Sequence, residues 1–128
     1  MLNRLPILIV EDEPYIALDL AFAIEDAGGR AIGPVSGVQE ALTLLGTAEI
    51  AAAILDVNLP DGDISPVVER LAEMGCPVIL QTGIGLPPAL ADRFSSLIVH
   101  IKPCRPERLI AELEELLGTC ETARAGSE

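Results

Sequence analysis

The sequence contains no tryptophan, and only two phenylalanines and one tyrosine among its 128 residues. Proteins that bind single-stranded nucleic acid stack the bases on aromatic side chains, and this chain has few residues for such a surface. Basic residues are also scarce, because eight Lys and Arg stand against twenty Asp and Glu, for a net charge of −12. This excess of negative charge repels phosphate backbones and anionic lipid. We therefore expect no direct nucleic acid partner and no membrane partner, and the acidity favours cations and other proteins instead.

Cysteine is sparse as well. Cys76, Cys104 and Cys120 are an odd number, without the close pairing that zinc sites and thioredoxin-like sites require. We interpret all three as reduced thiols of a cytoplasmic protein, and at Cys104 we favour a buried thiol over a redox sensor. The N-terminal apolar run stops between Val10 and Glu11, which makes it too short for the core of a signal peptide or for a membrane span.

The apolar residues indicate the fold class. They make up half of the chain, which is enough for one domain of this length to bury a core without disulfides or a structural metal. They gather in continuous runs, which are typical of parallel strands covered on both faces. The five runs are Leu5–Val10, Ala31–Val35, Ala51–Leu55, Pro77–Leu80 and Leu97–Ile101. Because segments with helical spacing alternate with them, we predict an α/β fold built on a doubly wound, five-stranded parallel sheet.

The predicted helices are marked by their first and last residues. We expect them to begin at Pro14, Ser36, Ser65, Pro87 and Pro106. At the second of these, Ser36 and Gln39 have the spacing of a capping box. The fifth helix is expected to end at Gly118, where the residues become small and polar. We therefore predict a domain over residues 1–117 and a disordered tail over residues 118–128.

Polar residues follow four of the predicted strands. In an open α/β sheet the ligand crevice lies beyond the carboxyl ends of the strands, where we expect Glu11, Asp12, Asp56, Thr82 and Lys102. Carboxylates that converge on one crevice repel each other and need a cation between them, and hard oxygen ligands favour Mg²⁺. With Mg²⁺ and a lysine to steady a phosphoryl group, Asp56 can attack phosphorus. The hydroxyl of Thr82 can then hydrogen-bond a phosphoryl oxygen.

Each of these residues alone has a simpler interpretation. Acidic residues after strands are commonly helix N-terminal charges, as we expect of Glu13, or turn residues, as an isolated Asp56 could be. The functional interpretation is favoured because all five positions fall at strand ends when the strands are assigned from hydrophobicity alone.

The ordered set resembles the receiver domain of bacterial two-component response regulators. It consists of Glu11-Asp12, the stretch Asp56-Val57-Asn58-Leu59-Pro60-Asp61-Gly62, then Thr82-Gly83 and Lys102-Pro103, and the resemblance runs from about Leu5 to Leu117. It implies the flavodoxin-like (βα)5 receiver fold with strand order 2-1-3-4-5. It also implies a phosphoprotein of phosphorelay signalling that is not a turnover enzyme.

The same resemblance implies roles for the acidic residues. Asp56 would be the phosphoacceptor. Asp12 and Asp56 would bind Mg²⁺ together with the main-chain carbonyl of Asn58, and Glu11 would hold the metal through water. The phosphodonor would be a histidine kinase or a histidine phosphotransfer protein. The downstream protein target stays open, and so does the question of whether the chain forms a homodimer.

The resemblance also implies an activation step. Thr82 and Lys102 would contact the phosphoryl group, and in the family an aromatic ring swings inward as the threonine moves. We assign the place of this aromatic to His100, two positions before the lysine, and predict that phosphorylation moves it from an outward to an inward rotamer. A second departure is the stretch Ile84–Ser96, in which Pro87-Pro88 leaves only a short fourth helix, so we expect an unusual partner at that surface.

The motif set is compatible with more than one function. We favour a stand-alone receiver, a phosphorylation-controlled switch that signals through contacts with other proteins. The alternatives are a phosphate sink and an interaction module that does not depend on phosphorylation. A phosphatase of the haloacid dehalogenase type would need a second aspartate two residues after the nucleophile, and Asn58 stands there.

The first predicted helix carries two apolar stripes. The stripe that should face the sheet consists of Ile16, Leu20, Ala23 and Ala27. At about 100° per residue, the second stripe points away from it and consists of Tyr15, Leu18 and Phe22. Either part of this second stripe packs on the fifth helix, or the stripe is open for contact with the helical bundle of a kinase.

Overall fold

The computed structural model describes residues 2–83 and 98–126, with side chains described as far as Gly118. Five parallel strands form one sheet in the order β2-β1-β3-β4-β5. The strands are β1 (Pro6–Val10), β2 (Arg30–Val35), β3 (Ala52–Asp56), β4 (Val78–Thr82) and β5 (Ile98–Ile101). The predicted α/β class, the parallel sheet and its strand order are thereby confirmed.

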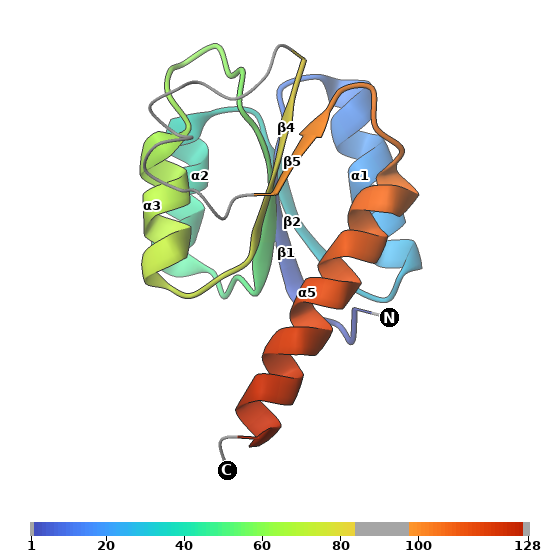
Figure 1. The fold of residues 1–128 in the computed structure, drawn as a ribbon. Helices are drawn as coiled ribbons and strands as arrows, with labels where there is room; N and C mark the ends of the chain where they lie inside the picture. The colour runs from blue at the N-terminus through green and yellow to red at the C-terminus, as the bar shows by residue number, and fades with distance from the viewer. Residues whose placement is uncertain (1, 84–97, 127–128) are drawn as a thin grey trace.

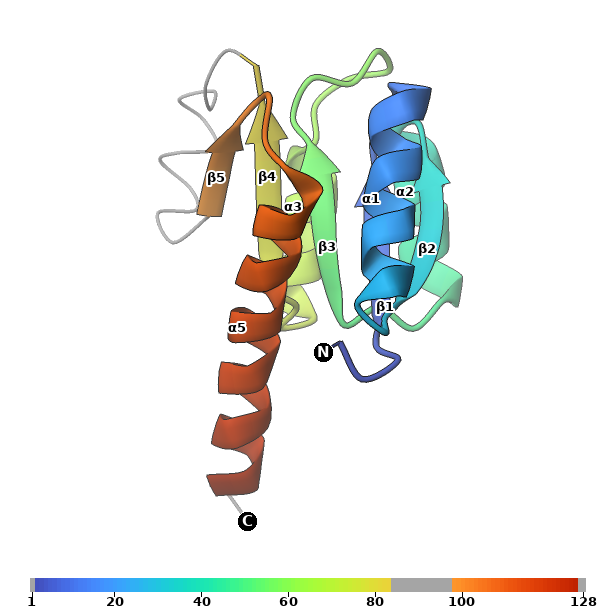
Figure 2. The same cartoon turned by 90° about the vertical axis from the view of Figure 1, so that its right-hand side faces the viewer.

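Helices cover both faces of the sheet (Figure 1). They are α1 (Pro14–Asp26), α2 (Val38–Thr47), α3 (Ser65–Glu73) and α5 (Pro106–Gly126). Helices α2 and α3 lie on one face, and α1 and α5 lie on the other, in front of the sheet in Figure 2. The predicted short helix at Pro87 and the stretch Ile84–Ser96 lie outside the described residues.

The core has two halves, one on each face of the sheet. In β1, Leu8 and Val10 pack toward α2 and α3, whereas Ile7 and Ile9 pack toward α1 and α5. All four are fully buried, and burial of each such side chain contributes roughly 1.5–3 kcal/mol. Because successive side chains point to opposite faces, a strand that is covered on both sides must be apolar at every position. This is the physical reason for the continuous apolar runs.

Two helices depart from the prediction. The buried residues of α1 are Ala17, Leu20 and Ile24, so the face that meets the sheet is rotated slightly from the predicted stripe. Helix α5 does not end at Gly118 but continues to Gly126, through part of the predicted tail. The residues after Gly118 include alanine, arginine and glutamate, which are good helix formers, and one glycine costs a helix only about 1 kcal/mol.

The N-terminus of α2 is capped by a residue that is distant in sequence. The predicted capping box does not form, because the hydroxyl of Ser36 donates to Glu40 Oε1 at 3.2 Å instead. The backbone N–H groups of Val38 and Gln39 donate to the two carboxylate oxygens of Asp61, at 2.9 and 3.3 Å. Asp61 therefore ties the loop after β3 to the start of α2.

We expect the replacement Asp61→Ala to destabilise the fold at neutral pH and to cost less in acid. The hydrogen bond from Val38, joined by that from Gln39, lowers the pKa of Asp61 below its ordinary value. The stabilisation is therefore present above the pKa that this carboxyl has in the unfolded chain, and is lost as the pH falls through the lower, folded pKa. Urea unfolding at pH 7 and pH 3 measures the difference between wild type and variant.

The control for this prediction is Gly37→Ala. A Cβ at Gly37 would lie 2.8 Å from Asp61 Oδ2, so this variant disturbs the same contact without removing the carboxylate. If Asp61→Ala is equally destabilising at both pH values, the carboxylate does not act as the cap.

Candidate functional site

The carboxyl ends of four strands bring the predicted site residues together. Glu11 follows β1, Asp56 and Thr82 are the last residues of β3 and β4, and Lys102 follows β5. The strand arrowheads in Figure 2 mark this edge of the sheet. Parallel strands all end at the same edge, and so residues far apart in sequence become neighbours there.

Three carboxylates and one ammonium group form an acidic pocket at this edge. One carboxylate oxygen from each of Glu11, Asp12 and Asp56 lies within 4.8 Å of the others. Glu11 and Asp56 are buried, with 2% and 1% of their surface exposed, whereas Asp12 is exposed. The Nζ of Lys102 lies 2.9 Å from Glu11 Oε1 and 3.2 Å from Asp56 Oδ2.

The ammonium group of Lys102 compensates only part of the negative charge of the three carboxylates. Burial, reinforced by the neighbouring Asp56, raises the pKa of Glu11 to about 7, while Lys102 and the backbone N–H of Glu13 act in the opposite direction. Partial burial alone would lower the pKa of Lys102, but the two carboxylates outweigh it and raise that pKa. The ammonium group is therefore held in its charged form.

A divalent cation fits this arrangement. Three carboxylates converge here, and the ammonium group of Lys102 beside them does not balance their combined charge. A hard ion among the carboxylates would supply further positive charge, and oxygen donors are the ligands that Mg²⁺ prefers.

Asn58 connects the end of β3 to the end of β4. Its backbone N–H donates to Asp56 Oδ1 at 3.0 Å, and its side-chain Nδ2 donates to Thr82 Oγ1 at 3.4 Å. Asp56 is thus held from two sides, by this N–H and by Lys102. The predicted role of the Asn58 carbonyl as a metal ligand stays a prediction.

His100 is not brought to Thr82. Its neighbour in β5, Val99, packs toward α2 and α3, and so does Leu80, two residues before Thr82 in β4. Because side chains alternate along a strand, Thr82 shares that face, whereas His100 points to the opposite face. There its Nε2 lies 2.8 Å from Glu112 Oε1 of α5. A rotamer change cannot carry His100 through the sheet, so its assignment as the switch residue does not fit this geometry.

The second stripe of α1 is open. The exposed fractions of Tyr15, Leu18 and Phe22 are 85%, 53% and 65%. All three side chains are therefore largely exposed, and contact with a kinase stays a prediction.

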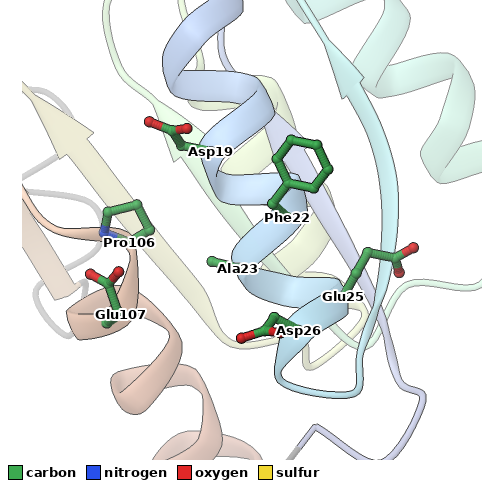
Figure 3. Close-up of a pocket in the computed structure, with 7 residues that line it drawn as sticks. All are labelled: Asp19, Phe22, Ala23, Glu25, Asp26, Pro106 and Glu107. Atoms are coloured by element: carbon green, nitrogen blue, oxygen red, sulfur yellow. The ribbon is translucent and has the colours of Figure 1, made fainter.

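Phe22 borders a groove of about 720 Å³ between α1 and α5 (Figure 3). Ala23 and Pro106 also line this groove. Its remaining lining residues are all acidic, and they are Asp19, Glu25, Asp26 and Glu107. The groove therefore combines an exposed aromatic ring with negative charge.

Two further sequence predictions concern the cysteines and a possible membrane span. Cys76 and Cys104 are both half-buried and free of disulfides, and Cys76 donates to the carbonyl of Ile50 at 3.2 Å. Within residues 2–83 and 98–126 there is no helix whose length and apolar character would allow it to span a bilayer.

Comparison with known proteins gives related sequences and structures. No family model matches the chain. A curated protein, the phyllosphere-induced regulator PhyR of Methylorubrum extorquens, is 31% identical over 121 residues, which cover 92% of this chain. The chain spans only 45% of the length of that relative.

Among solved structures, SdrG from Sphingomonas melonis Fr1 is 35% identical with a TM-score of 0.74, and the match covers 91% of this chain and 98% of SdrG. The CheY-like response regulator receiver domain protein from Methanospirillum hungatei JF-1 has a TM-score of 0.82 at 22% identity, over 93% of this chain and 98% of that one. The latter likeness shows the fold alone.

Proposed function

Because this chain belongs to the receiver domain family of response regulators, a family of phosphoacceptors rather than turnover enzymes, we propose that Asp56 accepts a phosphoryl group in a Mg²⁺-dependent step. The observation that carries this proposal is the placement of Asp56. Its carboxylate is buried at the edge of the sheet, between the ammonium group of Lys102 and two further carboxylates that can hold a cation.

The step is a displacement at phosphorus. A carboxylate oxygen of Asp56 forms a bond to phosphorus, and the bond between phosphorus and the donor nitrogen of a phosphohistidine, or the donor oxygen of an acyl phosphate, breaks. Glu11, Asp12 and Asp56 would hold the Mg²⁺, with the carbonyl of Asn58 as the proposed main-chain ligand. When bound, the ion supplies positive charge against the negative charge that accumulates.

The protein groups around Asp56 orient it and stabilise the product. The Asn58 N–H and Lys102 Nζ fix the two carboxylate oxygens before reaction. Lys102 already contacts Asp56 Oδ2, so it is in reach of a phosphoryl oxygen attached there. We propose that the hydroxyl of Thr82, at the end of the neighbouring strand, donates to another phosphoryl oxygen.

The proposed phosphodonor is a histidine kinase or a histidine phosphotransfer protein, as membership of the family implies. We propose that it docks on Tyr15, Leu18 and Phe22 of α1, which the structure leaves exposed. The helix begins three residues after Glu11, so a donor seated on its first turns lies beside the acidic pocket. Through its phosphorylated state the domain then signals to other proteins.

Removal of the metal tests the proposed function. With Mg²⁺ and a small acyl phosphate such as acetyl phosphate, intact-mass spectrometry should show one added phosphoryl group per chain, and an excess of chelator should abolish it. Mg²⁺ at one hundred times its dissociation constant should also stabilise the unphosphorylated chain by about 2.7 kcal/mol, seen as a rise in Tm. Sodium chloride at equal ionic strength separates a salt effect from binding of the divalent ion. An adduct that forms equally well in chelator would contradict the proposal.

A further inference from the structure

A second cluster of reactive side chains lies on the α5 side of the sheet. The Sγ of Cys104 is 3.7 Å from Nδ1 of His100, and Nε2 of the same ring is 2.8 Å from Glu112 Oε1. The side chain of His100 is 15% exposed and that of Glu112 is 32% exposed. Thiol, imidazole and carboxylate thus form a chain of contacts in which each group reaches the next.

The contact with Glu112 determines what His100 can do. A carboxylate accepts a hydrogen bond, so Nε2 must carry the hydrogen, and in the neutral ring Nδ1 is left with a lone pair. That lone pair is on the nitrogen nearest to the Cys104 thiol. A nucleophile next to a base, with the base oriented by a third group, is the arrangement that activates thiols in enzymes.

The residues around this cluster indicate which kind of reagent would react with the thiol. Gln81 pairs with His100 across β4 and β5, is 2% exposed, and has a side-chain Nε2 without a hydrogen-bond acceptor among the described residues. In the segment that follows Cys104, Arg105, Glu107 and Arg108 line a hollow of about 610 Å³. Two guanidinium groups against one carboxylate give this hollow a net positive charge, which favours an anionic reagent although the chain as a whole is strongly acidic.

We propose that Cys104 is a reactive thiol that forms a mixed disulfide with an anionic low-molecular-weight disulfide. The thiol proton passes to His100 Nδ1, and Glu112 stabilises the imidazolium. The thiolate attacks one sulfur of the disulfide, so that a new S–S bond forms and the original S–S bond breaks. The leaving thiolate takes the proton from His100. The incoming disulfide is the oxidant, and one of its halves leaves as a reduced thiol.

Alkylation of the full-length, reduced chain tests the activation. Iodoacetamide is added at pH 7, and peptide mass spectrometry gives the rate at each cysteine. An ordinary thiol is only a few per cent thiolate at this pH, so we expect Cys104 to react at least about tenfold faster than Cys76. The variants His100→Gln and Glu112→Gln should remove most of this advantage and leave the rate at Cys76 unchanged.

The pH profile separates activation from mere accessibility. The thiol contacts His100 on β5, which in turn contacts Glu112 on α5, and the charged residues nearest to it along the chain are Lys102, Arg105, Glu107 and Arg108. The advantage of the wild type over His100→Gln should be largest near pH 7 and should shrink as the pH rises, because a thiol that ionises unaided no longer needs a base. A profile that does not differ between the two proteins overturns the proposal.

Two disulfides identify the co-reactant. Oxidised glutathione is anionic, and the disulfide of 2-mercaptoethanol is neutral. Arg105→Gln and Arg108→Gln should slow formation of the mixed disulfide with glutathione several-fold and leave the neutral reagent unaffected. If Cys104 reacts no faster than Cys76 with either reagent, the proposal is wrong. If circular dichroism shows that His100→Gln does not fold, the reaction rate of Cys104 in Glu112→Gln is compared with that in the wild type instead.

Discussion

The variant Asp56→Asn is expected to show no phosphoryl adduct with any donor, under conditions in which the wild type gains one phosphoryl group per chain. Asparagine has nearly the same shape as aspartate, but its amide lacks the anionic oxygen that forms the bond to phosphorus. The fold should persist, because the substitution removes one of two buried carboxylates that repel each other across the pocket. Intact-mass spectrometry measures the adduct, and thermal unfolding shows that the variant is folded.

Two further variants make this result specific. Asp12→Asn keeps the nucleophile and loses an exposed carboxylate of the metal site. It should still be labelled, but the Mg²⁺ concentration for half-maximal labelling should rise at least about tenfold. Glu73→Gln removes an exposed carboxylate at the end of α3 and should behave as the wild type. A phosphoryl adduct on Asp56→Asn would place the acceptor elsewhere.

The sequence predicted the fold and the acidic pocket for related physical reasons. The strands that carry the site are covered by helices on both sides, so their apolar runs are continuous and easily found. Once the strands are found, parallel topology brings their carboxyl ends together. It can therefore be predicted that Glu11, Asp56 and Lys102 lie close together, even when no side-chain contact is known.

The same continuity hid the orientation of β5. When both faces of a strand are buried, the hydrophobic pattern does not show which residues point to which face, so the sequence alone does not show that His100 points away from Thr82. Its contact with Glu112 joins residues twelve apart, on different elements, and no local pattern marks it. The cap of α2 by Asp61 is of the same kind, since the donor residues and the acceptor are more than twenty residues apart.

Leu18→Asp and Phe22→Asp are expected to slow phosphotransfer from a histidine kinase by about thirtyfold or more. Meanwhile, labelling by a small acyl phosphate should be unchanged. Both side chains are exposed on α1, and an apolar anchor in the centre of an interface is typically worth about 2 kcal/mol or more. A small donor needs only the acidic pocket, so it reports on the chemistry independently of docking. Rates with both donors, measured for a kinase that phosphorylates the wild type, give the comparison.

The control is Met74→Asp, which places the same charge on another exposed apolar residue, just beyond α3. It should leave both rates unchanged. The acidic groove beside Phe22 adds an electrostatic test, since a partner that carries basic residues opposite Asp19 and Glu107 should associate more slowly as salt rises. If the two donors slow together in the α1 variants, the substitutions have damaged the pocket itself, and the stripe is not a docking surface. If neither slows, the kinase approaches Asp56 from another face.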